Sequence, residues 1–213
     1  MRTSLASLLA ILSLPVHAFD TVKVADGVYA LVGDLGQRSP ENLGHNMTSG
    51  FIVTDDGVVV IDTGASKLGA QTIHAAIRKI TDKPVIYAIN SGGQDHRWLG
   101  NDFFRRQGAK LVASAAGLDD MRKRGAEQAA MSERFLKNKF AGTVPVYPEI
   151  TFKNHFTLPV KGGRIELIDT GGAHTPGDIL IWLPQHSIVF AGDTVFVHDG
   201  HEQLRGHERA GGR

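Results

Sequence analysis

Acidic and histidine residues occur at several points where a short apolar segment ends. Asp95 and His96 follow an apolar segment at residues 84–90. His174 precedes a Thr-Pro-Gly-Asp turn, and Asp193 follows Ala-Gly after another apolar segment. Loops at strand ends lie side by side, so such side chains can converge in space. Histidine nitrogens and carboxylates can hold zinc, which lowers the pKa of bound water toward about 7 and supplies hydroxide for attack on a carbonyl.

The absence of cysteine restricts this chemistry. The 213 residues contain ten histidines and no cysteine. Thiolate zinc sites, disulfides and cysteine nucleophiles are therefore excluded. Any metal must be held by His, Asp or Glu.

The composition predicts one globular domain. Hydrophobic residues make up 42% of the chain and charged residues 21%, and the formal net charge is +1. A chain of this length can bury a substantial core but not two full domains. Without a strong basic field we expect a small-molecule partner and no nucleic acid. Nothing in the sequence identifies a protein partner.

The N-terminus predicts export. Met1-Arg2 is a short basic start, residues 5–14 are mostly apolar, and the cleavage-like signal Val-His-Ala ends at Ala18. The apolar run is shorter than the roughly 20 residues that a membrane span needs. We expect residues 1–18 to be a signal peptide and the mature protein to be periplasmic or secreted, with no membrane span after cleavage. A retained anchor or an N-terminal strand is the alternative.

The elements that position the candidate residues alternate between strands and helices. Short β-prone runs, turn signals and helical spacing of apolar residues predict a layered α/β fold, with helices on the outer faces of sheets. A polar tail at residues 199–213 is expected to be disordered. The expected strands are residues 21–25, 27–32, 49–54, 58–61, 84–90, 110–114, 149–152, 156–160, 164–169, 179–183 and 187–191. The expected helices are 66–80, 98–107 and 117–140, the last as one long helix or two shorter ones.

Four landmarks in order resemble the metallo-β-lactamase superfamily. They are Asp62-Thr-Gly after a Val-Val-Val-Ile run, Ala-Ile-Asn90, Gly-Ala-His174-Thr-Pro-Gly-Asp, and Phe-Ala-Gly-Asp193-Thr. The resemblance implies an αββα sandwich over residues 19–198 with an incomplete C-terminal part. The export signal and a Trp-Leu-Gly-Asn segment look most like periplasmic members associated with quinoprotein oxidation systems.

The family's central ligand motif is altered in this chain. The family motif is His-x-His-x-Asp-His, whereas this sequence reads Asn90-Ser-Gly-Gly-Gln-Asp-His-Arg97. Under either of two alignments both leading histidines are missing. The alternative ligand positions are Gly92, Gln94, His96 and Arg97, or Ser91, Gly93, Asp95 and His96. The family's last histidine lies beyond a further strand and helix, and His198, His201 and His207 in the tail are only chance substitutes.

The surviving residues imply a site for one zinc ion at most. By the resemblance, the metal ligands are Asp95, His96, His174 and Asp193, with Asp95 and His96 also catalytic. Asp62 and Asn90 are expected to orient this site without binding the metal.

Three alternatives involve the same region. Asp95 could instead cap the helix expected from residue 98. Arg97 could pair with Asp95 or Asp193, which would make a metal unnecessary. Arg97 and His45 are candidate contacts for a substrate or anion, although a surface position for His45 is the simpler interpretation.

Two classes of function follow. The first is an exported hydrolase in which a zinc-bound hydroxide attacks an ester, thioester or lactam-like bond. The alternative is a metal-free, non-catalytic binding protein, in which Arg97 and the Gly92-Gly93 backbone hold an anionic small molecule. A truncated, inactive remnant of such a hydrolase is a further alternative, because loss of a final strand would expose a sheet edge.

Overall fold

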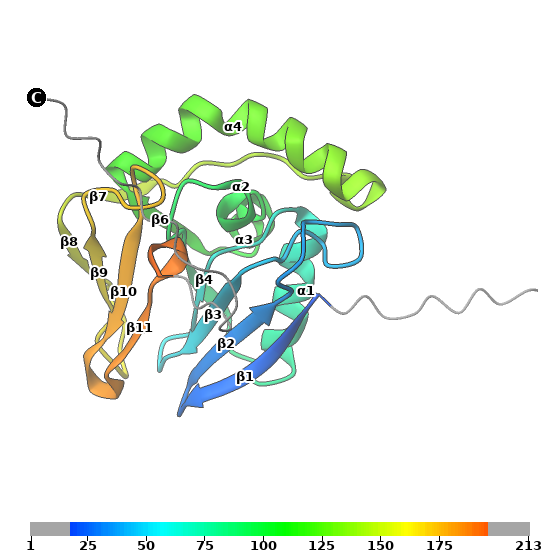
Figure 1. The fold of residues 1–213 in the computed structure, drawn as a ribbon. Helices are drawn as coiled ribbons and strands as arrows, with labels where there is room; N and C mark the ends of the chain where they lie inside the picture. The colour runs from blue at the N-terminus through cyan, green and yellow to red at the C-terminus, as the bar shows by residue number, and fades with distance from the viewer. Residues whose placement is uncertain (1–17, 196–213) are drawn as a thin grey trace, which may run out of the picture.

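Two β-sheets packed face to face form the centre of the molecule (Figure 1). The structure is a computed structural model that describes residues 18–195. The expected signal peptide, except for Ala18, and the expected polar tail lie outside the described residues. The larger sheet contains, in spatial order, β1 (Phe19–Ala25), β2 (Val28–Gly33), β3 (Thr48–Val53), β4 (Val58–Ile61), β5 (Val85–Ile89), β6 (Lys110–Ser114) and β7 (Ile150–Phe152). The smaller sheet contains β11 (Ile188–Phe190), β10 (Ile179–Leu183), β9 (Glu166–Asp169) and β8 (His155–Thr157).

The strand directions decide where the loops of the site meet. β1 to β4 pair antiparallel, whereas β4, β5, β6 and β7 pair parallel. Parallel strands need crossovers, which α1 (Lys67–Arg78), α2 (Asp95–Trp98) with α3 (Asn101–Arg106), and α4 (Ala115–Leu136) provide. The carboxyl ends of β4 and β5 therefore lie together, with Ile61 paired to Ile89. This edge brings Asp62 next to the loop that follows Asn90.

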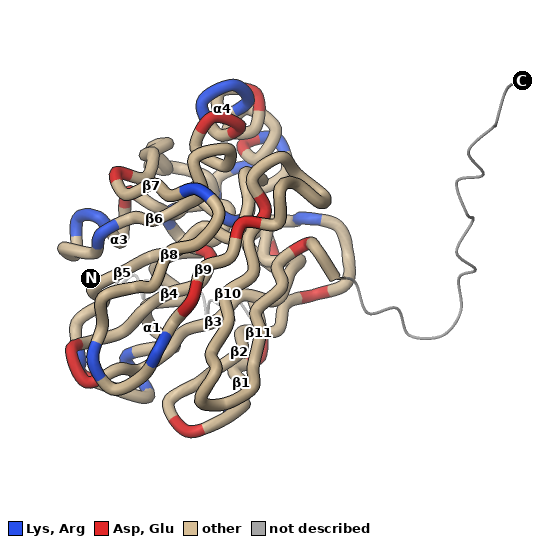
Figure 2. Tube along the Cα trace, turned by 90° about the vertical axis from the view of Figure 1, so that its left-hand side faces the viewer, with Lys and Arg blue, Asp and Glu red and all other residues tan. Residues whose placement is uncertain are grey.

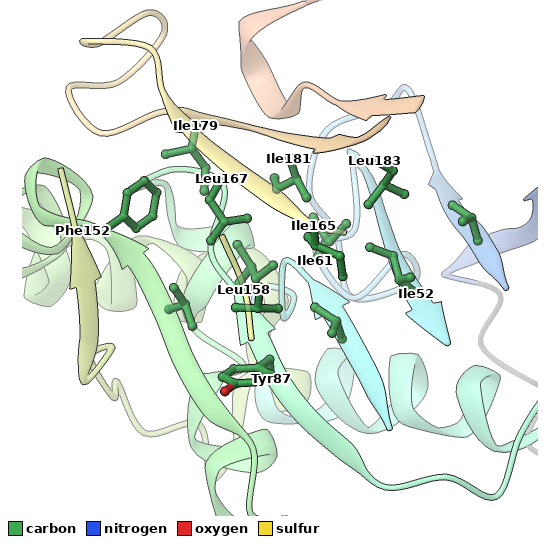
Figure 3. Close-up of a cluster of buried hydrophobic side chains, with 14 residues drawn as sticks. Ile52, Ile61, Tyr87, Phe152, Leu158, Ile165, Leu167, Ile179, Ile181 and Leu183 are labelled. Carbon is green, nitrogen blue, oxygen red and sulfur yellow. The ribbon is translucent and has the colours of Figure 1, made fainter. Parts of the chain in front are cut away.

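Apolar side chains from both sheets fill the space between them (Figure 3). Ile61 and Ile89 of the larger sheet belong to the same buried cluster as Leu167 and Ile181 of the smaller sheet. All four side chains are at most 1% exposed. Burial of this apolar surface is the main stabilising contribution to the sandwich.

The helices cover the other face of the larger sheet. Ile73 and Ile77 of α1 pack in one buried cluster with Val60 and Leu111. The helix begins after Ser66, whose hydroxyl accepts a hydrogen bond of 3.1 Å from the backbone N–H of Gly69. Figure 2 shows both signs of charge side by side along α4, so this longest helix carries no band of one sign. None of the helices in residues 18–195 is long and apolar enough to cross a bilayer.

The structure confirms the layered α/β sandwich and changes two of the expected helices. The helix expected at residues 117–140 is α4 followed by a short 3-10 helix, η1 (Lys137–Phe140). The helix expected at residues 98–107 corresponds to α3, which begins only at Asn101, while a separate short helix, α2, ends at Trp98. Gly100 passes so close to the neighbouring loop that a Cβ atom would lie 2.1 Å from the carbonyl oxygen of Thr63. Its N–H donates to the carbonyl oxygen of Gly64 at 2.9 Å. This close approach fixes the start of α3 and diverts α2, with Asp95, His96 and Arg97, toward the sheet edge.

Candidate functional site

Asp62 connects the end of β4 to the loop after β5. The residue has a positive φ of 62°, which is uncommon for a residue other than glycine. Its carboxylate accepts hydrogen bonds from the backbone N–H of Ser91 at 2.8 Å and from the Ser91 hydroxyl at 2.7 Å. The sheet edge therefore holds the start of the altered motif in place.

Arg97 is the centre of the site. Its side chain is 2% exposed, and its guanidinium forms ion pairs with Asp62 and Asp193. Toward Asp193 the pairing is bidentate, with Nη2 2.5 Å from Oδ1 and Nε 3.1 Å from Oδ2. Nη1 also donates to the Ser91 hydroxyl at 3.1 Å. Burial disfavours the charged guanidinium, but the two carboxylates outweigh it and raise the Arg97 pKa above its ordinary value.

Asp193 reaches the site from the opposite sheet. It lies in η3 (Gly192–Thr194), directly after β11. Burial would raise the pKa of its carboxyl, but the contact with His96 and the hydrogen bonds and charge of Arg97 lower it far below its usual range. Asp193 is therefore an ionised partner of Arg97.

A second arginine occupies the other half of the site. Arg38, in the loop between β2 and β3, donates from Nη1 to Oδ2 of Asp95 at 2.6 Å and from Nη2 to Nδ1 of His96 at 2.5 Å. The Ser132 hydroxyl of α4 donates to the same Asp95 oxygen at 2.7 Å. Burial would raise the pKa of Asp95, but the His96 ring, Arg38 and Ser132 together lower it. The side chain of Asp95 does not cap α2, which begins at Asp95 itself with Gln94 as its N-cap residue.

The contact with Arg38 determines the tautomer of His96. A guanidinium can only donate, so Nδ1 must accept, and the ring proton is placed on Nε2. Nε2 is buried 3.4 Å from Oδ2 of Asp193, and it has no hydrogen-bond partner within the described residues. Neither ring nitrogen therefore presents an unused lone pair to a metal.

Amide side chains fix the backbone of the segment that carries Arg97. Asn90 donates to the carbonyl oxygen of Arg97 at 2.8 Å, and Asn101 donates to the Asn90 side chain at 2.9 Å. The Trp98 indole N–H donates to Gln128 of α4 at 2.9 Å, and Gln128 donates to the carbonyl oxygen of Gly93 at 2.9 Å. These bonds fix the backbone from which the Arg97 side chain projects.

The donor atoms do not fit a zinc ion. Within residues 18–195, no three His, Asp or Glu side chains are grouped so that they could hold a metal. The expected ligand set of Asp95, His96, His174 and Asp193 is thus not assembled, and His174 is exposed. The physical reason is that Arg97 and Arg38 already bind the carboxylates and the imidazole. A divalent cation beside two guanidinium groups would also meet strong repulsion.

His45 is buried rather than at the surface, and the simpler sequence interpretation is wrong on this point. Its side chain is 1% exposed, and its ring lies 4.7 Å from that of Phe19. Nε2 lies 3.3 Å from both the carbonyl oxygen of Leu31 and the Ser49 hydroxyl. Burial lowers the pKa of His45 from 6.5 to about 4.

A cleft of about 520 Å³ adjoins the ion pairs. Its walls come from β1, β2, the β2–β3 loop and β11, and most of them are apolar. Charged side chains that line it are Asp34, Asp62, Arg97 and Asp193. A volume of this size is typical of a small-molecule site.

Sequence reasoning missed Arg38, Ser132 and Asp34. Arg38 lies in a Gly-, Pro- and Asn-rich loop, 57 residues before its partner Asp95. No spacing or motif connects these positions, and only the tertiary fold brings them together.

The two sheets, the outer helices and the site at the sheet edge define a metallo-β-lactamase sandwich. A family model described as the metallo-beta-lactamase superfamily matches residues 42–207, more than half of the chain. The chain belongs to the metallo-beta-lactamase superfamily.

Individual relatives are distant. Metallo-beta-lactamase IND-1 from Chryseobacterium indologenes is 24% identical over 166 residues, which cover 78% of this chain and 59% of that protein. A metallo-beta-lactamase from Pontibacter korlensis has a TM-score of 0.64 at 20% identity, covering 81% of this chain and 70% of that one. The inverting sec-alkylsulfatase Pisa1 from Pseudomonas sp. has a TM-score of 0.58 at 17% identity, covering 78% and 30%. At these identities the similarity to the solved structures establishes the fold.

Proposed function

We propose that this chain is a metal-free small-molecule-binding protein built on a hydrolase-like fold. The observation that carries the proposal is the guanidinium of Arg97, which bridges Asp62 and Asp193. The cation at this position belongs to the chain itself. The proposal corresponds to the alternative of a binding protein rather than to a zinc-dependent hydrolase.

The energetics of the ion pairs support this assignment. Asp193 could ligate zinc fully only if Arg97 released it, which would leave a buried guanidinium with one partner fewer. Breaking a buried pair by removing one partner costs about 3–5 kcal/mol. The same argument applies to His96, because Nδ1 accepts from Arg38. Zinc binding would have to overcome both losses.

The cleft supplies the binding site in this proposal. It adjoins Arg97 and Asp193 but is not filled by the ion pairs. Small-molecule sites are typically concave and mostly apolar with a few charged groups, as this cleft is. The balanced charge of α4 also favours a small molecule over nucleic acid. Export to the periplasm or medium remains part of the proposal, and it rests on residues 1–18 of the sequence.

The zinc hydrolase remains the second candidate, on one specific observation. Nε2 of His96 lies 3.4 Å from Oδ2 of Asp193, so these two groups would need little movement to share an ion once the ring proton has left Nε2. The required change is larger elsewhere, because Arg97 and Arg38 must withdraw and His174 must join them. Turnover of an ester, thioester or lactam-like bond would depend on that rearrangement.

Thermal unfolding in the presence of zinc or EDTA distinguishes the two candidates. Zinc at a hundredfold excess over its Kd would stabilise a zinc-binding protein by about 2.7 kcal/mol. We expect equal unfolding temperatures in EDTA and in micromolar zinc. Stabilisation by zinc that disappears in His174→Ala would contradict the proposal and support the hydrolase.

A further inference from the structure

The charge of the cleft indicates which ligands it can take. We infer that the cleft binds an apolar molecule that carries one cationic group, such as an alkylammonium ion. This inference rests on the proposed binding function and specifies the ligand class. It differs from the anionic ligand of the sequence-based alternative, for which Arg97 is the candidate partner.

The apolar part of the ligand would meet exposed apolar side chains. Large hydrophobic residues of three strands, of the β2–β3 loop and of the segment after β11 line the cleft and are exposed. Solvent-exposed apolar surface gathered in a concave site is typical of ligand-binding sites. Those residues are Val24 of β1, Val32 of β2, Leu35 of the β2–β3 loop, Val189 of β11 and Val195.

The charged groups of the cleft have an acidic excess. Three aspartates, Asp34, Asp62 and Asp193, and one arginine, Arg97, line it, which gives a formal charge of −2. The charge of Arg97 is already balanced by two carboxylates at hydrogen-bonding distance. An anion entering the cleft would gain little from Arg97 and would be repelled by the remaining carboxylate charge.

Two of the carboxylates remain accessible to a ligand. Asp34 is exposed, and its carboxylate accepts from the N–H of Gly36 at 2.8 Å. That hydrogen bond holds the Asp34 pKa below its ordinary value. The Asp193 side chain is 14% exposed beside Arg97. Each carboxylate has about four lone-pair directions, so both can accept from an ammonium group in addition to their present donors.

Three probes of equal chain length test the inference. Decylammonium, decanol and decanoate share an apolar body and differ in head-group charge. Binding of each to the purified, chelator-treated protein is measured by titration calorimetry below the concentration at which the probes aggregate. We expect decylammonium to bind at least about tenfold more tightly than decanoate, with decanol between them, and high salt to narrow the difference. Equal binding of all three, tighter binding of decanoate, or no binding of decylammonium would overturn the inference.

A matched pair of variants localises the effect. Asp34→Asn keeps the side-chain oxygen that accepts from Gly36, removes the charge, and replaces the oxygen that accepts from Asn42 at 3.4 Å with an amide group. We expect it to weaken decylammonium binding about threefold to tenfold and leave decanol unchanged. Asp82→Asn is the control, because Asp82 is exposed beside Arg78 and does not line the cleft. An equal effect of both substitutions would contradict a specific cation site.

The zinc content of the same preparation separates the two proposals. Stoichiometric zinc before chelation would overturn the metal-free function, while the preference among the three probes would still test the charge of the cleft. A zinc-free protein that prefers decanoate would overturn only the inference about the ligand.

Discussion

Two arginine-centred clusters occupy the site, and they differ in how the fold supports them. The Arg97 cluster consists of Arg97, Asp62 and Asp193, and the Arg38 cluster consists of Arg38, Asp95 and His96. The Arg97 side chain is 2% exposed, whereas the Arg38 side chain is 18% exposed and extends from a loop.

The difference in burial separates two tasks. The backbone of Arg97 is held by Asn90, and its side chain joins β4 to the segment after β11, so this cluster connects the two sheets. Arg38 instead attaches the β2–β3 loop, which lines the cleft, to α2. The same type of ion pair therefore stabilises the sandwich in one cluster and positions a wall of the cleft in the other.

The largest effect is expected at Arg97. Arg97→Met leaves two carboxylates buried or half-buried without their cation, and we expect the free energy of unfolding to fall by about 3–5 kcal/mol. Urea titration measures this change. Arg106→Met is the matched control, because Arg106 is 70% exposed in its pair with Asp102. For the control we expect the free energy of unfolding to fall by less than about 1 kcal/mol. Similar losses for both variants would contradict the larger role assigned to the buried pair.

Acid should destabilise the protein through His45, because burial lowers its pKa and the nearby charge of Arg97 lowers it further. Its pKa is about 4 in the folded state and 6.5 ordinarily, so the unfolded chain binds the extra proton between these values. The contribution of His45 to the free energy of unfolding is therefore fully present above pH 6.5. It is lost as the pH falls toward 4, by up to about 3 kcal/mol.

The test is the slope of unfolding free energy against pH, not its absolute value. We expect His45→Gln to flatten the slope between pH 6.5 and 4, and the exposed-site variant His186→Gln to keep it. An unchanged slope in His45→Gln would show that another group causes the acid sensitivity.

A smaller effect is expected at Arg38. Arg38→Met removes charge-assisted hydrogen bonds to Asp95 and His96, but Asp95 keeps the hydrogen bond from the Ser132 hydroxyl, and Arg38 itself is 18% exposed, so we expect a loss of about 1–2 kcal/mol. We also expect the substitution to increase the rate of amide exchange in the β2–β3 loop more than in β4 and β5. A loss of stability as large as that of Arg97→Met, or amide exchange that increases equally in the strands, would show that the two clusters stabilise the fold as one unit.

The sequence predicts the strands well because their signals are local. Asp55-Asp56-Gly57 marks the turn before β4, and the strand expected at residues 110–114 is β6 with the same bounds. The helix expected at 98–107 fails at Gly100, where contact with Thr63 overrides the local helical pattern.

The site is predictable only in part. The possibility that Arg97 pairs with Asp193 follows from the sequence. In one alignment Arg97 occupies a ligand position of the family motif, and in the other it directly follows the last ligand position. The participation of Asp62 in that pair, the role of Arg38 and the burial of His45 depend on contacts between distant segments. No local pattern carries that information.

The metal content of the purified mature protein tests the central claim most directly. Elemental analysis follows dialysis against trace zinc and then against metal-free buffer. The two-arginine site predicts far less than one zinc per chain in a folded sample, and the same result for His174→Ala. About one zinc per chain, lost in His174→Ala, would contradict the account and show that His174 completes a metal site in place of the arginine pairs.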